Sequence, residues 1–251
     1  MIWSFLQKLS SPKYFYVMSG RFIPWFGWAC LLFTLIGLYQ GLVVAPMDYL
    51  QGNSYRIMFI HVPAASMSMF VYMIIAISGA IGLVWRIKLA DVIAASSAPL
   101  GASFTFLALV TGSLWGKPAW GTWWQWDARL ASELILFFLY LGIIALNSAI
   151  EDKRTAAKAS AVLALVGVVN IPIIHYSVTW WNTLHQPSSN ILSPQSSIHL
   201  SMRIPLLLML VSFQLYYAMV VLMRARCEIL ERERNTQWVQ ELASNQKLPS
   251  S

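Results

Sequence analysis

The sequence predicts an all-α, polytopic membrane protein with six transmembrane helices. Of its 251 residues, 58% are hydrophobic and only 11% are charged, whereas a soluble domain carries about 25% charged residues. Long uncharged stretches recur along the chain, and about 20 apolar residues suffice for a helix to cross the hydrocarbon. These segments must be helices, because lipid satisfies no backbone hydrogen bonds and no stretch alternates like the strands of a barrel.

The charged residues that bound each uncharged stretch place the spans. Five stretches are enclosed by Arg21 and Asp48, Arg56 and Arg86, Asp91 and Lys117, Glu133 and Glu151, and Arg203 and Arg224. A further one follows Lys158 and ends before the run NTLHQPSSNILSPQSS, which is too polar to lie in lipid. We therefore expect spans at 22–45, 57–84, 92–113, 130–150, 159–180 and 204–223.

The distribution of basic residues predicts the orientation. Only four of the 17 Lys and Arg residues fall on the side of loops 46–56, 114–129 and 181–203, namely Arg56, Lys117, Arg129 and Arg203. Because cytoplasmic loops carry the excess of Lys and Arg, both termini are expected in the cytoplasm. The chain then divides into a cytoplasmic N-terminal segment (1–21), a six-helix membrane domain (22–223) and a cytoplasmic C-terminal tail (224–251).

Composition also excludes several classes of function. The net charge of +7 is explained by topology rather than by nucleic-acid binding, because the basic residues lie between apolar blocks. Cys30 and Cys227 form no Cys-x-x-Cys motif, which argues against thiol redox chemistry, a zinc site and covalent haem attachment. The N-terminus lacks the features of a cleaved signal peptide, so we expect it to be retained.

Tryptophans gather on the outer side. Five of the 12 tryptophans fall in the run WGKPAWGTWWQWDARL, namely Trp115, Trp120, Trp123, Trp124 and Trp126. An aromatic belt at the membrane interface is the alternative, and it suits Trp25, Trp28 and Trp85 better than this dense cluster. Gly116, Pro118 and Gly121 predict that the cluster begins as a loop, with a helix from near Trp123 that places Trp123, Trp126 and Asp127 on one face. Packed indole rings would form a flat platform for a large planar ligand.

Four histidines, His61, His175, His185 and His199, are all predicted to lie in the outer half. A planar metal macrocycle has one open axial position on each face, so a bis-histidine site needs two separate segments. His61, in the second span, and His185, in the loop after the fifth span, meet this requirement. A packing role is the alternative for both, and it is the better interpretation of His175 and His199.

The run W-G-x-x-x-W-G-x-W-W-x-W-D-x-R-L, from Trp115 to Leu130, resembles the signature of the membrane haem-handling family with a tryptophan-rich WWD motif. The six spans and the run SVTWWNTLHQ are similar to the haem exporter branch of that family, which serves cytochrome c maturation. The resemblance implies that His61 and His185 are axial ligands of haem iron, and that the tryptophan-rich segment holds the macrocycle edge. The expected cofactor is haem b, bound transiently by both histidines.

The resemblance also implies a place of action and a set of partners. It implies the bacterial inner membrane, with the functional face periplasmic, and a haem-presenting role rather than an enzymatic one. The implied partners are a periplasmic haem chaperone, the ATPase and membrane subunits of an ABC transporter, and a small membrane adaptor subunit. The chain has no phosphate loop of its own, so any ATP dependence would come from a partner.

Basic and acidic side chains on the outer side fit this expectation. Arg56, Arg129 and Arg203 could pair with haem propionates, although snorkelling to the interface is an equal alternative. Asp127 could pair with Arg129, or it could accept the imidazole N–H of a ligating histidine.

Two other functions remain open from the sequence. An intramembrane b-type cytochrome would place its paired histidines deeper, on facing helices. The permease subunit of an ABC transporter would show charged or broken helices near the midplane, and no charge is expected deep in any span.

Overall fold

The structure is a computed structural model that describes residues 11–185 and 198–246. In this part of the chain, six helical segments are long and apolar enough to cross a membrane, which confirms the predicted number. They are Pro12–Val44, Ser54–Trp85, Lys88–Trp120, Ala128–Ala149, Lys153–Trp180 and Leu200–Arg232. Most extend past the predicted spans, because Lys and Arg near a helix end can reach the interface without ending the helix.

The first two spans begin earlier than expected. Helix α2 (Pro12–Tyr39) starts inside the predicted N-terminal segment, with Pro12 in its first turn, where the missing N–H of proline costs no hydrogen bond. It widens into a π-helical turn, η1 (Gln40–Val44). A 3₁₀ turn, η2 (Ser54–Ile57), then leads into α3 (Met58–Trp85).

The prediction that the tryptophan cluster begins as a loop is wrong, because helix α4 (Lys88–Trp120) extends into it. Trp115 and Trp120 are helical, and the chain leaves the helix at Gly121, which has φ of 79° and whose N–H bonds Lys117 O at 3.0 Å. The next helix, α5, starts at Ala128 and not near Trp123, so Trp123, Trp126 and Asp127 do not share a helical face. The glycine-rich pattern marks the end of α4 because a left-handed glycine is the usual helix C-cap.

The later spans show one break. Helix α5 (Ala128–Ala149) is followed by α6 (Lys153–Gly167) and α7 (Asn170–Trp180), which together form the fifth span. At the break, the Asn170 side chain is buried and its Nδ2 donates to Ser132 O at 2.8 Å. Helices α8 (Leu200–Arg232) and α9 (Gln237–Gln246) complete the described chain.

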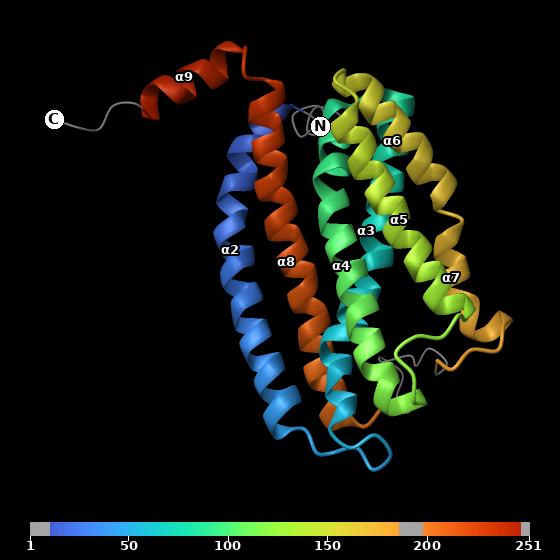
Figure 1. Ribbon diagram of the computed structural model, residues 1–251. Coiled ribbons are helices and arrows are strands. Elements are labelled where there is room, and N and C mark those ends of the chain that lie inside the picture. Colours follow the sequence, from blue (N-terminus) through green and yellow to red (C-terminus); the bar gives the residue numbers. More distant parts are fainter. Residues whose placement is uncertain (1–10, 186–197, 247–251) are drawn as a thin grey trace.

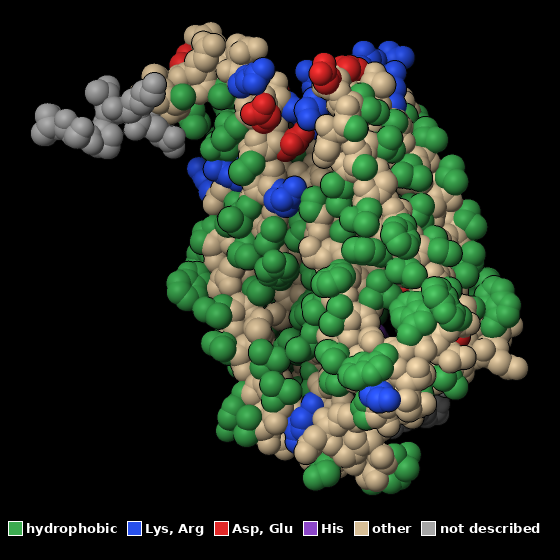
Figure 2. Space-filling view, in the orientation of Figure 1, with side chains coloured by type: hydrophobic (Ala, Val, Ile, Leu, Met, Phe, Trp, Pro, Cys, Tyr) green, Lys and Arg blue, Asp and Glu red, His purple; other side chains and the backbone are tan. Residues whose placement is uncertain are grey.

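The helices form an elongated bundle in which α2 packs along α8, and α3 packs along α4 (Figure 1). The largest hydrophobic cluster draws residues from α3, α4, α5, α6, α7 and α8. The start of α2 and helix α9 lie at one end, whereas the α2–α3 connection lies at the other end, hereafter the outer end (Figure 1). Charged side chains gather around the end where α9 lies, and hydrophobic ones cover the middle (Figure 2).

One charged residue is more buried than expected. Glu133, predicted to border the fourth span, lies inside α5 with only 8% of its surface exposed. Glu133 is the sixth residue of α5, so it lies near the outer end of the span and not at its middle. The sequence gives this distance from the helix end but not the direction that the side chain faces, so its burial could not be predicted.

Candidate functional site

His61 lies in the first turn of α3, at the outer end of the bundle. Its Nδ1 is 3.0 Å from Thr111 Oγ1 on α4. The Thr111 hydroxyl donates its proton to Leu107 O at 2.6 Å, so towards the imidazole it acts as the acceptor. The geometry assigns the proton to Nδ1 and leaves the lone pair on His61 Nε2 available.

His185 follows α7 and contacts the segment before α5. Its Nδ1 lies 3.3 Å from Asp127 Oδ2, and the side chains are 16% and 6% exposed. An ionised carboxylate only accepts hydrogen bonds, so His185 Nδ1 donates and its Nε2 is available as well. Burial is the main cause that lowers the pKa of His185, Arg129 lowers it further, and Asp127 opposes both. A lowered pKa favours the neutral imidazole that binds metals.

Asp127 has two roles at once. Its Oδ1 accepts the Leu130 N–H at 2.8 Å, which caps the N-terminus of α5, while Oδ2 holds His185. The expected contact with an imidazole is therefore present. The alternative, an ion pair between Asp127 and Arg129, is not found among the described residues.

Two tryptophans of α4 border the two histidines. The Trp115 and His61 rings meet edge to face, with centroids 5.8 Å apart and planes at 80°. The Trp120 and His185 rings do the same at 4.7 Å and 67°. Trp115 is fixed in turn by its Nε1, which donates to Gln51 Oε1 at 2.8 Å.

The other three tryptophans lie in the non-helical segment before α5. Trp124 and Trp126 meet at 79° with centroids 5.3 Å apart, so the cluster is not one flat platform as expected. Trp123 and Trp126 are 54% and 77% exposed. Trp124 is half-buried, and its Nε1 has no hydrogen-bond acceptor within the described part of the chain. The cluster thus divides into residues that border the histidines and residues that face outward.

The three arginines that were predicted to pair with propionates lie in different surroundings. Arg56 donates to Gly41 O at 2.6 Å, Ala45 O at 2.8 Å and Asn53 Oδ1 at 3.2 Å, so its guanidinium ties the end of the first span to the following loop. Arg129 is half-buried, and its charge acts on both His61 and His185. Arg203 lies in the first turn of α8.

The two remaining histidines lie elsewhere. His175 is exposed on α7, where its ring meets that of Tyr176 at 4.7 Å. His199 caps the N-terminus of α8 by accepting the Ser201 N–H at 3.3 Å. The cap formed by His199 is a structural role, whereas the packing role of the exposed His175 stays a prediction.

Sequence reasoning missed two residues that support His61. Thr111 holds Nδ1, and Gly112 leaves room for the ring, because a Cβ at Gly112 would lie 2.9 Å from His61 Cε1. A signal for Thr111 was available, since it precedes Trp115 by one helical turn and therefore shares its face.

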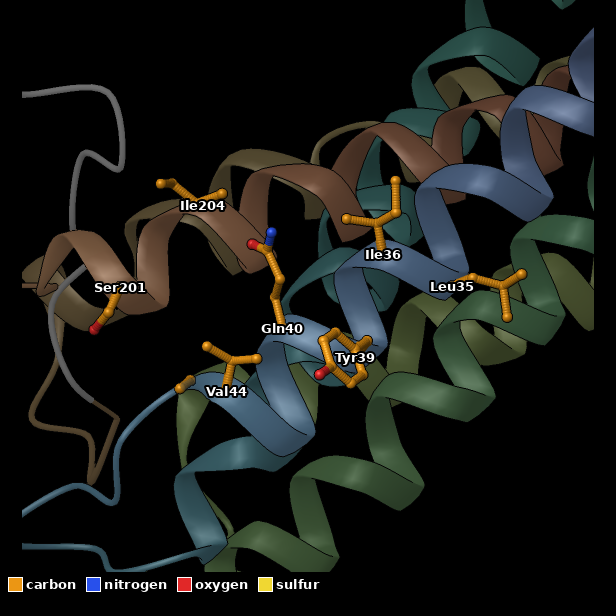
Figure 3. Close-up of a pocket in the computed structure, with 8 residues that line it drawn as sticks. Leu35, Ile36, Tyr39, Gln40, Val44, Ser201 and Ile204 are labelled. Atoms are coloured by element: carbon orange, nitrogen blue, oxygen red, sulfur yellow. The ribbon is translucent and has the colours of Figure 1, made fainter.

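A pocket among the described residues lies away from the histidines. It has a cavity volume of about 520 Å³ and opens between the end of α2, η1 and the start of α8 (Figure 3). Its lining consists of Leu35, Ile36, Tyr39, Gln40, Val44, Ala45, Ser201 and Ile204. No histidine or tryptophan lines it, so it is not the expected site.

Comparison with known proteins shows which family the chain belongs to. The family described as heme exporter protein C matches residues 5–240. Proteins of that name from Escherichia coli K12 and Haemophilus influenzae are 52% and 48% identical, over 96% and 98% of this chain and 97% and 100% of their own lengths. A Marchantia polymorpha mitochondrial protein, named for cytochrome c biosynthesis, is 45% identical over 82% of this chain and 87% of its own length. The chain therefore belongs to the heme exporter protein C family, a family of multi-pass membrane proteins of cytochrome c biogenesis.

Proposed function

We propose that this protein binds haem at the outer end of its bundle and passes it to a haem chaperone in the periplasm. The observation that carries the proposal is the state of His61 and His185. Each imidazole has its Nδ1 held by an oxygen, and neither Nε2 has a hydrogen bond to another described residue. Oxygen partners that fix the tautomer and orientation are the usual support of a metal-ligating histidine.

The surroundings of the two histidines fit haem, which supplies an iron with two axial positions, an apolar ring and two propionates. Trp115 and Trp120 provide aromatic walls beside the ligands. Arg129 provides a cation within electrostatic reach of both ligands. No side-chain hydrogen bond or ion pair of Arg129 is found in residues 11–185 and 198–246, so we assign it, rather than Arg56, to a propionate.

Transfer is favoured by the exposure of part of the tryptophan cluster. Trp123 and Trp126 project from the segment next to the ligands, and exposed tryptophans are typical anchors of protein–protein contacts. We propose that this surface receives the periplasmic haem chaperone. The ABC transporter ATPase and membrane subunits and a small adaptor are the further partners, and the chain acts as a carrier rather than as an enzyme.

The test is the absorption spectrum of the purified protein in detergent after addition of haem. We expect the parent protein to show the low-spin spectrum of bis-histidine haem. His61→Ala and His185→Ala should lose this spectrum, and added imidazole should restore it. His175→Ala and His199→Ala are the matched controls and should bind like the parent protein. A double variant of His61 and His185 that retains full haem content would refute the ligand assignment.

A further inference from the structure

Glu133 is a buried carboxyl that the proposed haem site does not use. Its side chain is 8% exposed, and its Oε1 has no hydrogen-bond partner in the described part of the chain. It lies one helical turn after Arg129 on α5, and the two side chains interact electrostatically. An ionisable residue inside a membrane span is costly and usually marks a function.

Arg129 needs a counter-charge at this place. It lies in the first turn of α5, where the helix dipole disfavours a cation. Asp127, its other acidic neighbour, is already engaged by Leu130 N and His185. Glu133 interacts with Ser68, but its Oε1 has no hydrogen-bond partner in the described part of the chain. It lies one helical turn from Arg129 without forming a direct ion pair, and the two side chains interact electrostatically.

Few other charges face Glu133. On its own helix lie Arg129 and the buried Tyr140, and α3 contributes Ser68. The buried Tyr72 of α3 and Tyr217 of α8 interact with Tyr140. Helix α7 brings the neutral amide of Asn170 next to Ser132. The charged residues of α4 and α6 lie near the ends of those helices, and they are Lys88, Asp91, Lys117, Lys153, Arg154 and Lys158.

We propose that Glu133 is the counter-charge of Arg129 in the ligand-free protein, and that a carboxylate of the ligand replaces it. This proposal rests on the proposed haem function. When a propionate pairs with Arg129, two carboxylates share one buried cation, and like charges at such a site disfavour joint ionisation. Glu133 then takes up one proton from the water at the outer end and becomes a neutral carboxylic acid.

The exchange makes release of the ligand easier. When the propionate leaves, Glu133 returns its proton to water and again neutralises Arg129. The half-buried guanidinium therefore always has a carboxylate nearby, either that of Glu133 or that of the ligand. Without Glu133, the guanidinium would hold the ligand more tightly. This property suits a protein that binds its cargo only to pass it on.

The experiment measures proton uptake on ligand binding, by titration calorimetry at pH about 7.5 in two buffers that differ in ionisation enthalpy. Iron protoporphyrin IX and its dimethyl ester are the two probes, since the ester lacks both carboxylates. The parent protein should take up about one proton with the diacid and none with the ester. Ligation through Nε2 of a neutral imidazole releases no proton, so it does not disturb this count.

Substitutions of Glu133 test its carboxyl group independently of the rest of the site. Glu133→Gln should abolish proton uptake with the diacid and slow its release about tenfold, whereas binding of the ester should be unchanged. Glu151→Gln, an exposed residue just after α5, is the matched control and should behave like the parent protein. Glu133→Asp keeps the charge and should keep the proton uptake.

Two results would overturn the proposal. One is the absence of any difference in proton uptake between diacid and ester in the parent protein, which needs no variant to fold. The other is unchanged proton uptake in Glu133→Gln. Either result leaves the haem function standing, because the bis-histidine spectrum of the parent protein is recorded in the same titration.

Discussion

The carboxylate of Asp127 and the imidazole of His185 lie 3.3 Å apart, between Oδ2 and Nδ1, although 58 residues separate them in the chain. The other oxygen of the same carboxylate caps α5 through Leu130 N. The start of one transmembrane helix and the orientation of a proposed haem ligand thus depend on a single side chain.

Asp127→Asn separates these two roles. Asparagine is as good an N-cap as aspartate, so its oxygen should keep the Leu130 N–H while its NH₂ faces His185 Nδ1. The imidazole proton then moves to Nε2 and blocks the iron. We expect haem affinity to fall roughly 10–100-fold with thermal stability close to that of the parent protein. Asp127→Ala should lose affinity and also about 1 kcal/mol of stability; equal haem binding by all three proteins would contradict the proposed orientation.

Gly112→Ala tests the space beside His61. The added Cβ would lie 2.9 Å from His61 Cε1, so the ring must shift away from Thr111. We expect haem affinity to fall roughly tenfold, measured from the Soret band during titration. Gly142→Ala is the control, because its Cβ would meet only the end of the flexible Leu163 side chain at 3.0 Å. Equal losses in both variants would indicate a general packing defect instead.

The lowered pKa of His185 predicts a pH dependence. Burial is the main cause of the shift below the ordinary value of 6.5, so between the two pKa values the unfolded chain binds more protons than the folded one. The free energy of unfolding should therefore decrease as the pH falls below about 6.5, until the folded pKa is passed. Haem retention should decline in the same range, because protonation removes the ligating lone pair. The measurement is the thermal unfolding midpoint of the parent protein and of His185→Gln at a series of pH values, because the difference between the two isolates the contribution of His185. A difference that does not change with pH would argue against the lowered pKa.

The tryptophans should divide into two groups. Trp120 contacts His185, and such an aromatic contact is worth about 0.5–1.5 kcal/mol, so Trp120→Ala should lower haem affinity up to about tenfold. Trp126 is 77% exposed, so Trp126→Ala should keep haem affinity and reduce transfer to the chaperone. Affinity and transfer are measured separately, by titration and by haem loaded onto the purified chaperone. Identical effects of the two substitutions on both quantities would refute the division.

The predicted orientation can be tested by cysteine labelling on a background that lacks Cys30 and Cys227. Tyr49, which is 90% exposed between α2 and α3, should react as Tyr49→Cys with a membrane-impermeant reagent added outside. Glu151→Cys, between α5 and α6, should react only after the membrane is permeabilised. Labelling in the opposite pattern would place the histidine site in the cytoplasm.

Properties that are local in sequence could be predicted well. The six spans follow from hydrophobic length, and they are confirmed because an apolar segment of that length becomes helical wherever it crosses lipid. The motifs around His61 and His185 single them out as candidate ligands, and the structure places both at the outer end with Nδ1 held by an oxygen. Their role as haem ligands stays a prediction. The predicted helix ends were less accurate, since Gly116, Pro118 and Gly121 suit the end of a helix as well as a loop.

Contacts between distant segments were decided only by the tertiary structure. The sequence presents Arg56 and Arg129 as equivalent cations, but packing gives three acceptors to Arg56 and sets Arg129 beside two histidines. It presents Glu133 as a border charge, whereas the helices around α5 bury it. Hydropathy depends on each residue alone, and it therefore fixes which segments enter the membrane; a hydrogen-bond partner or a buried charge depends on which helix faces which, and only the folded bundle determines that.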